Sequence, residues 1–85
     1  MIVNEKIKEF GQSLKDRLDP ELINYALAYI DYSEQVLAFE TLCDHIADYG
    51  IDITVDEYSK VLEIVKLLNL ELDNRYLYIN PNKQV

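Results

Sequence analysis

Residues 35–50 read QVLAFETLCDHIADYG, and the rest of the chain is best interpreted outward from this stretch. Its apolar side chains recur at intervals of three or four residues: Val36, Phe39, Cys43 and Ile46. That spacing puts them on one face of an α-helix, and such a face is normally buried against other helices. We expect the helix to end near Tyr49, because Gly50 adopts without strain the left-handed conformation that terminates many helices.

The opposite side of this predicted helix is acidic. Its carboxylates follow one another at intervals of four, at Glu40, Asp44 and Asp48, and Leu37 lies among them. Like charges four residues apart destabilise a helix by roughly 0.2–0.5 kcal/mol per pair, so the row is a poor choice for stability alone. It indicates either a solvated helix face or a surface that binds a basic partner, and the spacing leaves both open.

The acidic row belongs to a longer segment that contains no base. No Lys or Arg occurs between Arg17 and Lys60, whereas carboxylates accumulate there: Asp19, Glu21, Asp31, Glu34, Glu40, Asp44, Asp48, Asp52, Asp56 and Glu57. The net charge of −8 argues against nucleic acid as a direct ligand, because proteins that bind phosphates use clustered Lys and Arg. It fits a basic protein partner, or simply solubility.

A helix start and a stripe of tyrosines precede the opening stretch. Residues 19–21 (Asp-Pro-Glu) are typical of a helix start, because Asp accepts free backbone amides and Pro has no amide to leave unpaired. Two stripes follow at helical spacing: Ile23, Ala26, Leu27 and Ile30, and beside them Leu22, Tyr25, Tyr29 and Tyr32. Tyrosines are enriched at binding hot spots, but Tyr25 and Tyr29 would equally suit packing between helices. We expect Tyr32 to be exposed, in the turn where Ser33 caps the next helix.

Two further helices flank this pair. Residues 54–57 (Thr-Val-Asp-Glu) match a capping box and follow a short apolar connector at residues 51–53. The predicted apolar faces are Tyr58, Val61, Leu62, Val65 and Leu68 after the connector, and Val3, Ile7, Phe10 and Leu14 near the N-terminus. The N-terminal helix should end near Leu18. We expect an irregular or extended C-terminal tail, with Tyr76–Ile79 packed on the helices and Pro81 stopping anything regular.

The sequence therefore predicts an all-α fold: a small four-helix domain with short connections, in which residues 1–85 form one domain. No apolar run reaches 18 residues, so we expect no membrane-spanning segment. Residues 1–6 lack a basic flank followed by an apolar stretch, so we expect no signal peptide. A single cysteine cannot form an internal disulfide, which favours a cytoplasmic location.

Catalytic and metal-binding motifs find little support in the sequence. The sole histidine, His45, lies two residues from Cys43, and residues two apart on a helix do not face each other. Di-iron helices carry Glu three residues before His, where this chain has Leu42. Gly11 and Gly50 are the only glycines, so the sequence has no phosphate-binding glycine loop. We expect no enzymatic activity, no metal and no cofactor, with Cys43 in the core and His45 at the surface or at the rim of the core.

Residues 18–22 read LDPEL, residues 38–44 read AFETLCD, and residues 51–54 read IDIT, followed by Glu57 and Tyr58. In this order and spacing they resemble the MafI family of immunity proteins, and the resemblance covers residues 18–70. It departs from the family in two loops. The family often has a glycine where this chain has residues 31–34, and a proline at the position of Asp52.

The resemblance implies a function and a partner. Members of the family accompany secreted polymorphic toxins, including those of contact-dependent growth inhibition. They protect the producing bacterium by binding the toxin domain in the cytoplasm. Several such toxins are nucleases, with the EndoU ribonuclease class prominent among them. This chain would accordingly bind and occlude a cognate toxin nuclease domain that attacks cellular RNA.

We predict that the partner-binding surface lies on the helix that follows Ser33 and runs to about Tyr49, and on its flanking loops: Tyr32, Leu37, Glu40, Asp44, Asp48 and Asp52. The carboxylates would pair with Lys or Arg of a basic toxin, while Tyr32 and Leu37 would supply apolar anchors. We expect no direct nucleic-acid ligand and no membrane. An acidic helical adaptor without a toxin partner is the alternative, and a nucleic-acid mimic that blocks a DNA-binding protein is a further one. The tyrosines could also close a dimer, so the oligomeric state stays open.

Overall fold

The computed structural model describes residues 2–82. Its elements in chain order are α1 (Ile2–Gln12), α2 (Pro20–Ala28), the 3-10 helix η1 (Tyr29–Tyr32), α3 (Gln35–Asp48), α4 (Val55–Leu67) and α5 (Asn74–Tyr78). Residues 2–82 contain no strand, and none of their helices is long and apolar enough to cross a membrane. The prediction of an all-α fold is confirmed for these residues. The four predicted helices correspond roughly to α1, α2, α3 and α4, and the structure adds the short α5 and η1.

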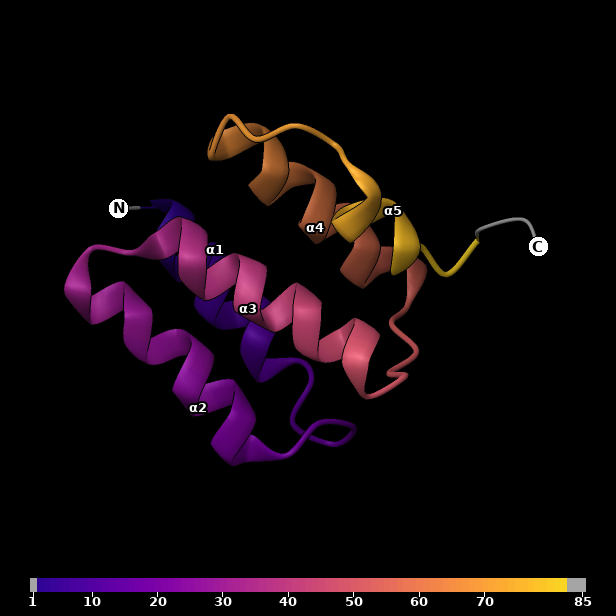
Figure 1. Ribbon diagram of the computed structural model, residues 1–85, viewed down its shortest axis with the longest axis horizontal. Helices are drawn as coiled ribbons and strands as arrows, with labels where there is room; N and C mark the ends of the chain where they lie inside the picture. The colour runs from indigo at the N-terminus through magenta and orange to yellow at the C-terminus, as the bar shows by residue number, and fades with distance from the viewer. Residues whose placement is uncertain (1, 83–85) are drawn as a thin grey trace.

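α3 packs against α1, α2, η1 and α5. In Figure 1, α3 lies toward the viewer with α2 along one side and α4 and α5 along the other. α1 runs behind α3 and packs against α2, α3 and α4. α5 packs on α3, so residues near the C-terminus lie against the middle of the chain. One long side of α3 is left facing outward.

Two predicted helix starts are present as expected. The Asp19 side chain accepts a hydrogen bond from the Glu21 amide at 2.9 Å, and Pro20 takes the first helical position of α2. At α4 the capping box is complete. The Glu57 amide donates to Thr54 Oγ1 at 3.0 Å, and the Thr54 amide donates to Glu57 Oε1 at 2.8 Å. Both signals are confirmed because each depends only on residues within one turn.

The end of α3 also follows its sequence signal. Gly50 has φ of +62°, the left-handed conformation that costs a glycine nothing. The Gly50 amide donates to the Ala47 carbonyl at 3.3 Å, and the Ile51 amide donates to the Ile46 carbonyl at 2.9 Å. These two bonds form the Schellman arrangement that satisfies the last carbonyls of a helix. The chain therefore turns sharply out of α3 into the connector.

The core combines the apolar faces that the periodicity predicts. Three aromatic rings run through it: Phe10 and Phe39 have centroids 6.3 Å apart, and Phe39 stacks on Tyr76 at 5.5 Å with planes 14° apart. Buried around them are Val3, Ile7, Leu14, Leu18, Ile23, Ala26, Ile30, Ala38, Leu42, Cys43, Ile46, Ile53, Tyr58, Val61, Ile64, Val65 and Ile79. Val36 and Leu62 were expected on these faces but are 37% and 38% exposed, because they lie at the edges of their stripes.

Two predicted boundaries are wrong. α1 ends at Gln12 rather than near Leu18, because residues 13–18 form successive tight turns. There the Ser13 hydroxyl donates to the Phe10 carbonyl at 2.6 Å, a side-chain bond that competes with helix continuation. Ser33 does not cap α3. It has φ of +60° and terminates η1 through its amide, and Glu34 takes the cap position without a side-chain hydrogen bond.

The prediction of an irregular or extended tail is wrong for residues 74–78, which form α5. Asp73 caps this helix, since its side chain accepts from the Arg75 amide at 3.0 Å. Tyr76 and Ile79 are buried, whereas Leu77 and Tyr78 are exposed. Burial at a spacing of three is helical, while an extended segment would bury every second side chain.

Candidate functional site

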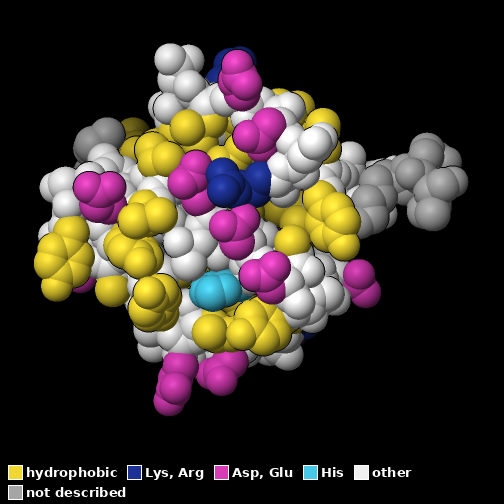
Figure 2. All heavy atoms as spheres, in the orientation of Figure 1, with side chains coloured by type: hydrophobic (Ala, Val, Ile, Leu, Met, Phe, Trp, Pro, Cys, Tyr) yellow, Lys and Arg dark blue, Asp and Glu magenta, His cyan; other side chains and the backbone are white. Residues whose placement is uncertain are grey.

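The outer face of α3 consists of Leu37, Glu40, Asp44 and Asp48, which the helix turns away from its buried side. Figure 2 looks onto the side of the molecule where α3 faces the viewer. Acidic side chains there surround a basic group, and apolar side chains lie on both sides of them. The structure thus brings four of the six predicted binding residues onto one face, as their spacing predicts.

A base from another part of the chain binds two carboxylates of this face. Arg75 of α5 donates through Nη1 to Glu40 Oε2 at 3.0 Å and through Nε to Asp44 Oδ1 at 2.9 Å. The hydrogen bond to Asp44 raises the pKa of Arg75 above its ordinary value. No base lies near the acidic row in the sequence, but Arg75 lies beside it in the folded protein. Its charge is partly compensated from 31 and 35 residues away.

Asp48 differs from the other two carboxylates of the row. It is exposed, and within residues 2–82 it forms no ion pair. It borders a shallow hollow of about 360 Å³ whose other lining residues include Ala47, Arg75 and Tyr78. Each carboxylate that Arg75 contacts offers it only one oxygen, so Glu40 and Asp44 also retain acceptors. The face therefore remains able to accept hydrogen bonds from a cation.

Apolar groups lie where η1 meets α3. Tyr32 is 77% exposed, as predicted, and Leu37 is 38% exposed. The two other tyrosines of the stripe behave differently from each other. Tyr25 is exposed and Tyr29 is half-buried, with their rings edge-to-face at 5.7 Å and the Tyr29 hydroxyl donating to that of Tyr25 at 3.3 Å. The stripe is thus partly core and partly surface.

Asp52 lies in a different environment from the rest of the predicted site. It belongs to the connector between α3 and α4, and its backbone carbonyl accepts from Arg17 Nη1 at 3.1 Å. Arg17 also binds both carboxylate oxygens of Glu57, at 2.7 and 2.6 Å, and the Ser13 carbonyl at 2.6 Å. This hydrogen bonding lowers the pKa of Glu57 to about 2. The connector is therefore held in place while the Asp52 side chain stays exposed.

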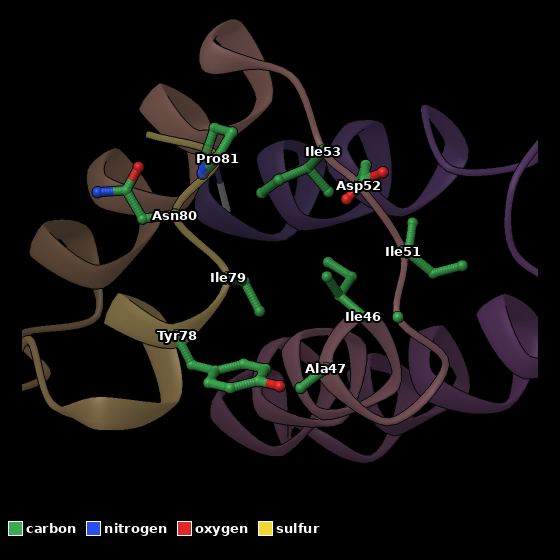
Figure 3. Close-up of a pocket in the computed structure, with 10 residues that line it drawn as sticks. Ile46, Ala47, Ile51, Asp52, Ile53, Tyr78, Ile79, Asn80 and Pro81 are labelled. Carbon is green, nitrogen blue, oxygen red and sulfur yellow. The ribbon is translucent and has the colours of Figure 1, made fainter. Parts of the chain in front are cut away.

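A pocket that the sequence gave no sign of opens beside Asp52. It has a volume of about 300 Å³ and lies between the end of α3, the connector and the residues after α5. Figure 3 shows Ile46, Ile53 and Ile79 pointing toward one another from these three segments, with the Tyr78 ring beside Ala47. Its walls come from segments about thirty residues apart in the chain, so no local pattern could predict it.

The residues considered for catalysis lie away from any such opening. Cys43 is fully buried, and burial raises the pKa of its thiol, which disfavours the reactive thiolate. His45 is half-buried at the rim, 6.0 Å from the Tyr49 ring between centroids, and its Nε2 has no hydrogen-bond partner in residues 2–82. No cluster of His, Cys, Asp or Glu within the described part of the chain is arranged to hold a metal ion.

Comparison of the chain with protein-family models, with curated proteins and with solved structures finds no match. The resemblance to the MafI family therefore remains a prediction from the sequence. What the chain does has to be argued from the face of α3 and its surroundings.

Proposed function

We propose that this protein is an immunity protein, which binds a cognate toxin domain and neutralises it by occlusion. One observation carries the proposal: the outer face of α3 combines a row of carboxylates with the exposed Leu37, and Tyr32 is exposed in η1, just before this helix. Large apolar groups flanked by charge are a common composition of protein-binding surfaces. The resemblance of residues 18–70 to the MafI family gives the partner its class, a nuclease toxin of the EndoU type.

The chemistry of such a toxin suits this surface. A ribonuclease binds the phosphates of its substrate with basic side chains, so its cleft is positively charged. Carboxylates on a rigid helix present negative charge to that cleft, which raises the association rate and helps to exclude other partners. Apolar anchors such as Tyr32 then contribute binding energy after water is displaced. Inhibition would follow because RNA and the inhibitor compete for the same basic surface.

The contributions within the surface should be unequal. Arg75 already holds one oxygen each of Glu40 and Asp44. A cation of the toxin would therefore share these two carboxylates with Arg75. Asp48 has no such competitor within residues 2–82 and is exposed at the end of α3. We assign it the largest electrostatic role in the row.

The test is a charge reversal with a matched control. The variant Asp48→Lys is compared with Glu9→Lys, which reverses an exposed carboxylate on α1, behind α3. Binding to a candidate toxin domain, the product of an adjacent toxin gene where one is found, is measured at low and high salt, together with RNA cleavage. Asp48→Lys should weaken binding by about tenfold or more at low salt and restore cleavage, whereas Glu9→Lys should change little.

Two results would count against the proposal. Equal effects of both reversals would mean that only the net charge of the protein matters, and the α3 face would then have no specific role. Failure of the unaltered protein to bind the toxin or to stop cleavage would remove the immunity function, and the adaptor alternative would then be preferred.

A further inference from the structure

The pocket at the end of α3 is built as a receptor for one long side chain. It encloses about 300 Å³, the lower end of the range for ligand pockets, which suits a single side chain better than a cofactor. Its lining is mixed: the buried side chains of Ile46, Ile53 and Ile79 form its apolar part, and polar groups, Asp52 among them, form the rest. An occupant therefore needs an aliphatic stem that can displace water from the apolar part.

The polar groups of the pocket favour a positive charge at the end of that stem. Asp52 supplies a carboxylate on the connector wall, and no Lys or Arg lines the pocket among the described residues. The pocket also lies at the C-terminal end of α3, where the helix dipole is negative. Gly50 exposes backbone on this rim, because its position has no side chain and open space where a Cβ would stand.

The positive charge of Arg17, which lies in the turns after α1 and contacts the connector, does not cancel this preference. Its guanidinium is bound by both oxygens of Glu57 and by Asp16, at 2.6 to 3.1 Å. These three side chains together carry a net negative charge. Arg17 instead fixes the Asp52 backbone, while the stacking of Tyr76 on Phe39 fixes α5 on the other side. The pocket is thus held open by contacts that lie outside it, which lowers the entropy lost on binding.

The pocket is continuous with the proposed binding face. Ala47 and Tyr78 line both this pocket and the hollow that Asp48 borders. A partner seated on the outer face of α3 would therefore pass directly over its mouth. We propose that the pocket receives an arginine side chain of the partner protein, with the stem against the isoleucines and the guanidinium at Asp52. The identity of the partner rests on the proposed function, whereas the preference for an arginine side chain rests on the residues of the pocket alone.

Arginine is preferred over lysine for two reasons. Its planar guanidinium can bind a carboxylate such as that of Asp52 through two parallel hydrogen bonds, which the ammonium group of lysine cannot. It is also less strongly hydrated than an ammonium group, so entry into a partly apolar pocket costs less. Tighter binding of a lysine analogue is therefore one result of the experiment that would contradict this choice.

The first experiment uses a small probe and needs no toxin. Nα-acetyl-arginine amide is titrated into the isotopically labelled protein, and amide chemical shifts of Gly50, Ile51 and Tyr78 are followed by NMR. The matched probe is Nα-acetyl-citrulline amide, which has nearly the same shape without the charge. With the arginine probe we expect saturable shifts confined to the pocket. We expect the citrulline probe to bind about tenfold more weakly, because it cannot form the charge-assisted contact.

Two variants sharpen this titration. Asp52→Asn removes the carboxylate charge but keeps the backbone carbonyl that Arg17 binds, so the fold is retained. Glu71→Gln removes an exposed carboxylate between α4 and α5 and serves as the control. Asp52→Asn should weaken arginine binding by about tenfold, and Glu71→Gln should leave it unchanged. No saturable shift, equal binding of citrulline, tighter binding of the lysine analogue, or indifference to Asp52→Asn would each overturn the proposal.

A second measurement separates this inference from the proposed function. The same two variants are assayed for toxin binding. A loss of about tenfold for Asp52→Asn alone supports use of the pocket by the toxin. Full affinity of Asp52→Asn for a toxin that the unaltered protein binds would overturn the arginine pocket and leave the immunity function standing. Binding of acetyl-arginine amide without any toxin binding would overturn the immunity function and leave the pocket standing.

Discussion

Arg17 and Arg75 each bring a positive charge to the segment that has none of its own, but they do so in different surroundings. Arg17 binds Glu57, whose side chain is only 10% exposed and also completes the capping box of α4. Arg75 binds Glu40 and Asp44, whose side chains are 28% and 49% exposed on the outer face of α3. Arginine therefore pairs with a buried carboxylate in one place and with two surface carboxylates in the other.

This difference in burial predicts different roles for the two arginines. A carboxylate that is withdrawn from water requires its partner, because an unpaired buried charge is costly. Carboxylates at the surface are solvated and gain little from theirs. We therefore expect the Arg17 contact to stabilise the fold and the Arg75 contact mainly to adjust the charge of the binding face. The attachment of α5 should depend on its apolar contacts instead.

The largest effect should come from Tyr76, which tests whether α5 is held by packing. Tyr76 is 1% exposed and stacked on Phe39, so Tyr76→Ala should lower the free energy of unfolding by about 3–5 kcal/mol. Urea unfolding measures this value. Leu77→Ala, on the exposed side of the same helix, is the control and should cost less than about 1 kcal/mol. Similar losses for the two variants would mean that α5 is not anchored by the Tyr76 ring.

Removal of Arg17 should have the next largest effect. Arg17→Met leaves the Glu57 carboxylate without its main partner, so the free energy of unfolding should fall by about 2–4 kcal/mol. The double variant Arg17→Met, Glu57→Gln should recover part of this loss, because a neutral amide is less costly to leave there. Urea unfolding of the two variants decides the point. A double variant that is less stable than Arg17→Met would show that the buried charge is not the cause.

The same pair predicts how stability depends on pH. The pKa of Glu57 is lowered to about 2 in the folded protein from an ordinary value of 4.5. The stabilisation is therefore fully present above pH 4.5 and is lost as the pH falls from there toward 2. By pH 3 it should have fallen by about 1–2 kcal/mol. Unfolding of the unaltered protein and of Glu57→Gln between pH 7 and 3 measures this difference. Parallel pH profiles would contradict it.

The sequence predicted those parts of the fold that depend on neighbouring residues. The caps at Asp19 and Thr54 and the turn at Gly50 are confirmed, because each is formed within one helical turn. The apolar faces are largely confirmed for the same reason. The tail was misjudged although its signals were present. Asp73 is a good cap, and Tyr76 and Ile79 have helical spacing, but five residues are too few for a periodic pattern to stand out.

The proposed binding surface was less predictable, because it depends on which distant residues meet. Spacing alone predicted that Leu37, Glu40, Asp44 and Asp48 share a face. It could not indicate that Arg75 neutralises part of that face, since the contacts span 31 and 35 residues. The pocket beside Asp52 was missed on the same grounds. The one hint was that the segment between Arg17 and Lys60 has no base of its own. Its carboxylates could therefore pair only with bases from outside the segment, such as Arg17 and Arg75.

The smallest effect on stability and the most informative for binding should come from Arg75. Arg75→Met should lower the free energy of unfolding by only about 0.5–1 kcal/mol, as for other exposed ion pairs. It also frees the two carboxylates that Arg75 binds, Glu40 and Asp44, and removes one positive charge from the face. The association rate with a basic toxin should therefore rise at low salt, and the gain should disappear at high salt as charges are screened.

Stopped-flow association at two salt concentrations measures this change, with Lys6→Met as the control. Lys6 also forms a surface ion pair, with Glu63 at 3.1 Å, but it lies on α1, behind α3. Both variants lose one positive charge, so a general effect of net charge would accelerate them equally. A larger acceleration for Arg75→Met requires that the freed carboxylates lie where the partner binds. Slower association of Arg75→Met would instead mean that Arg75 is itself part of the contact surface, and the row would have to be reinterpreted as a support for that arginine.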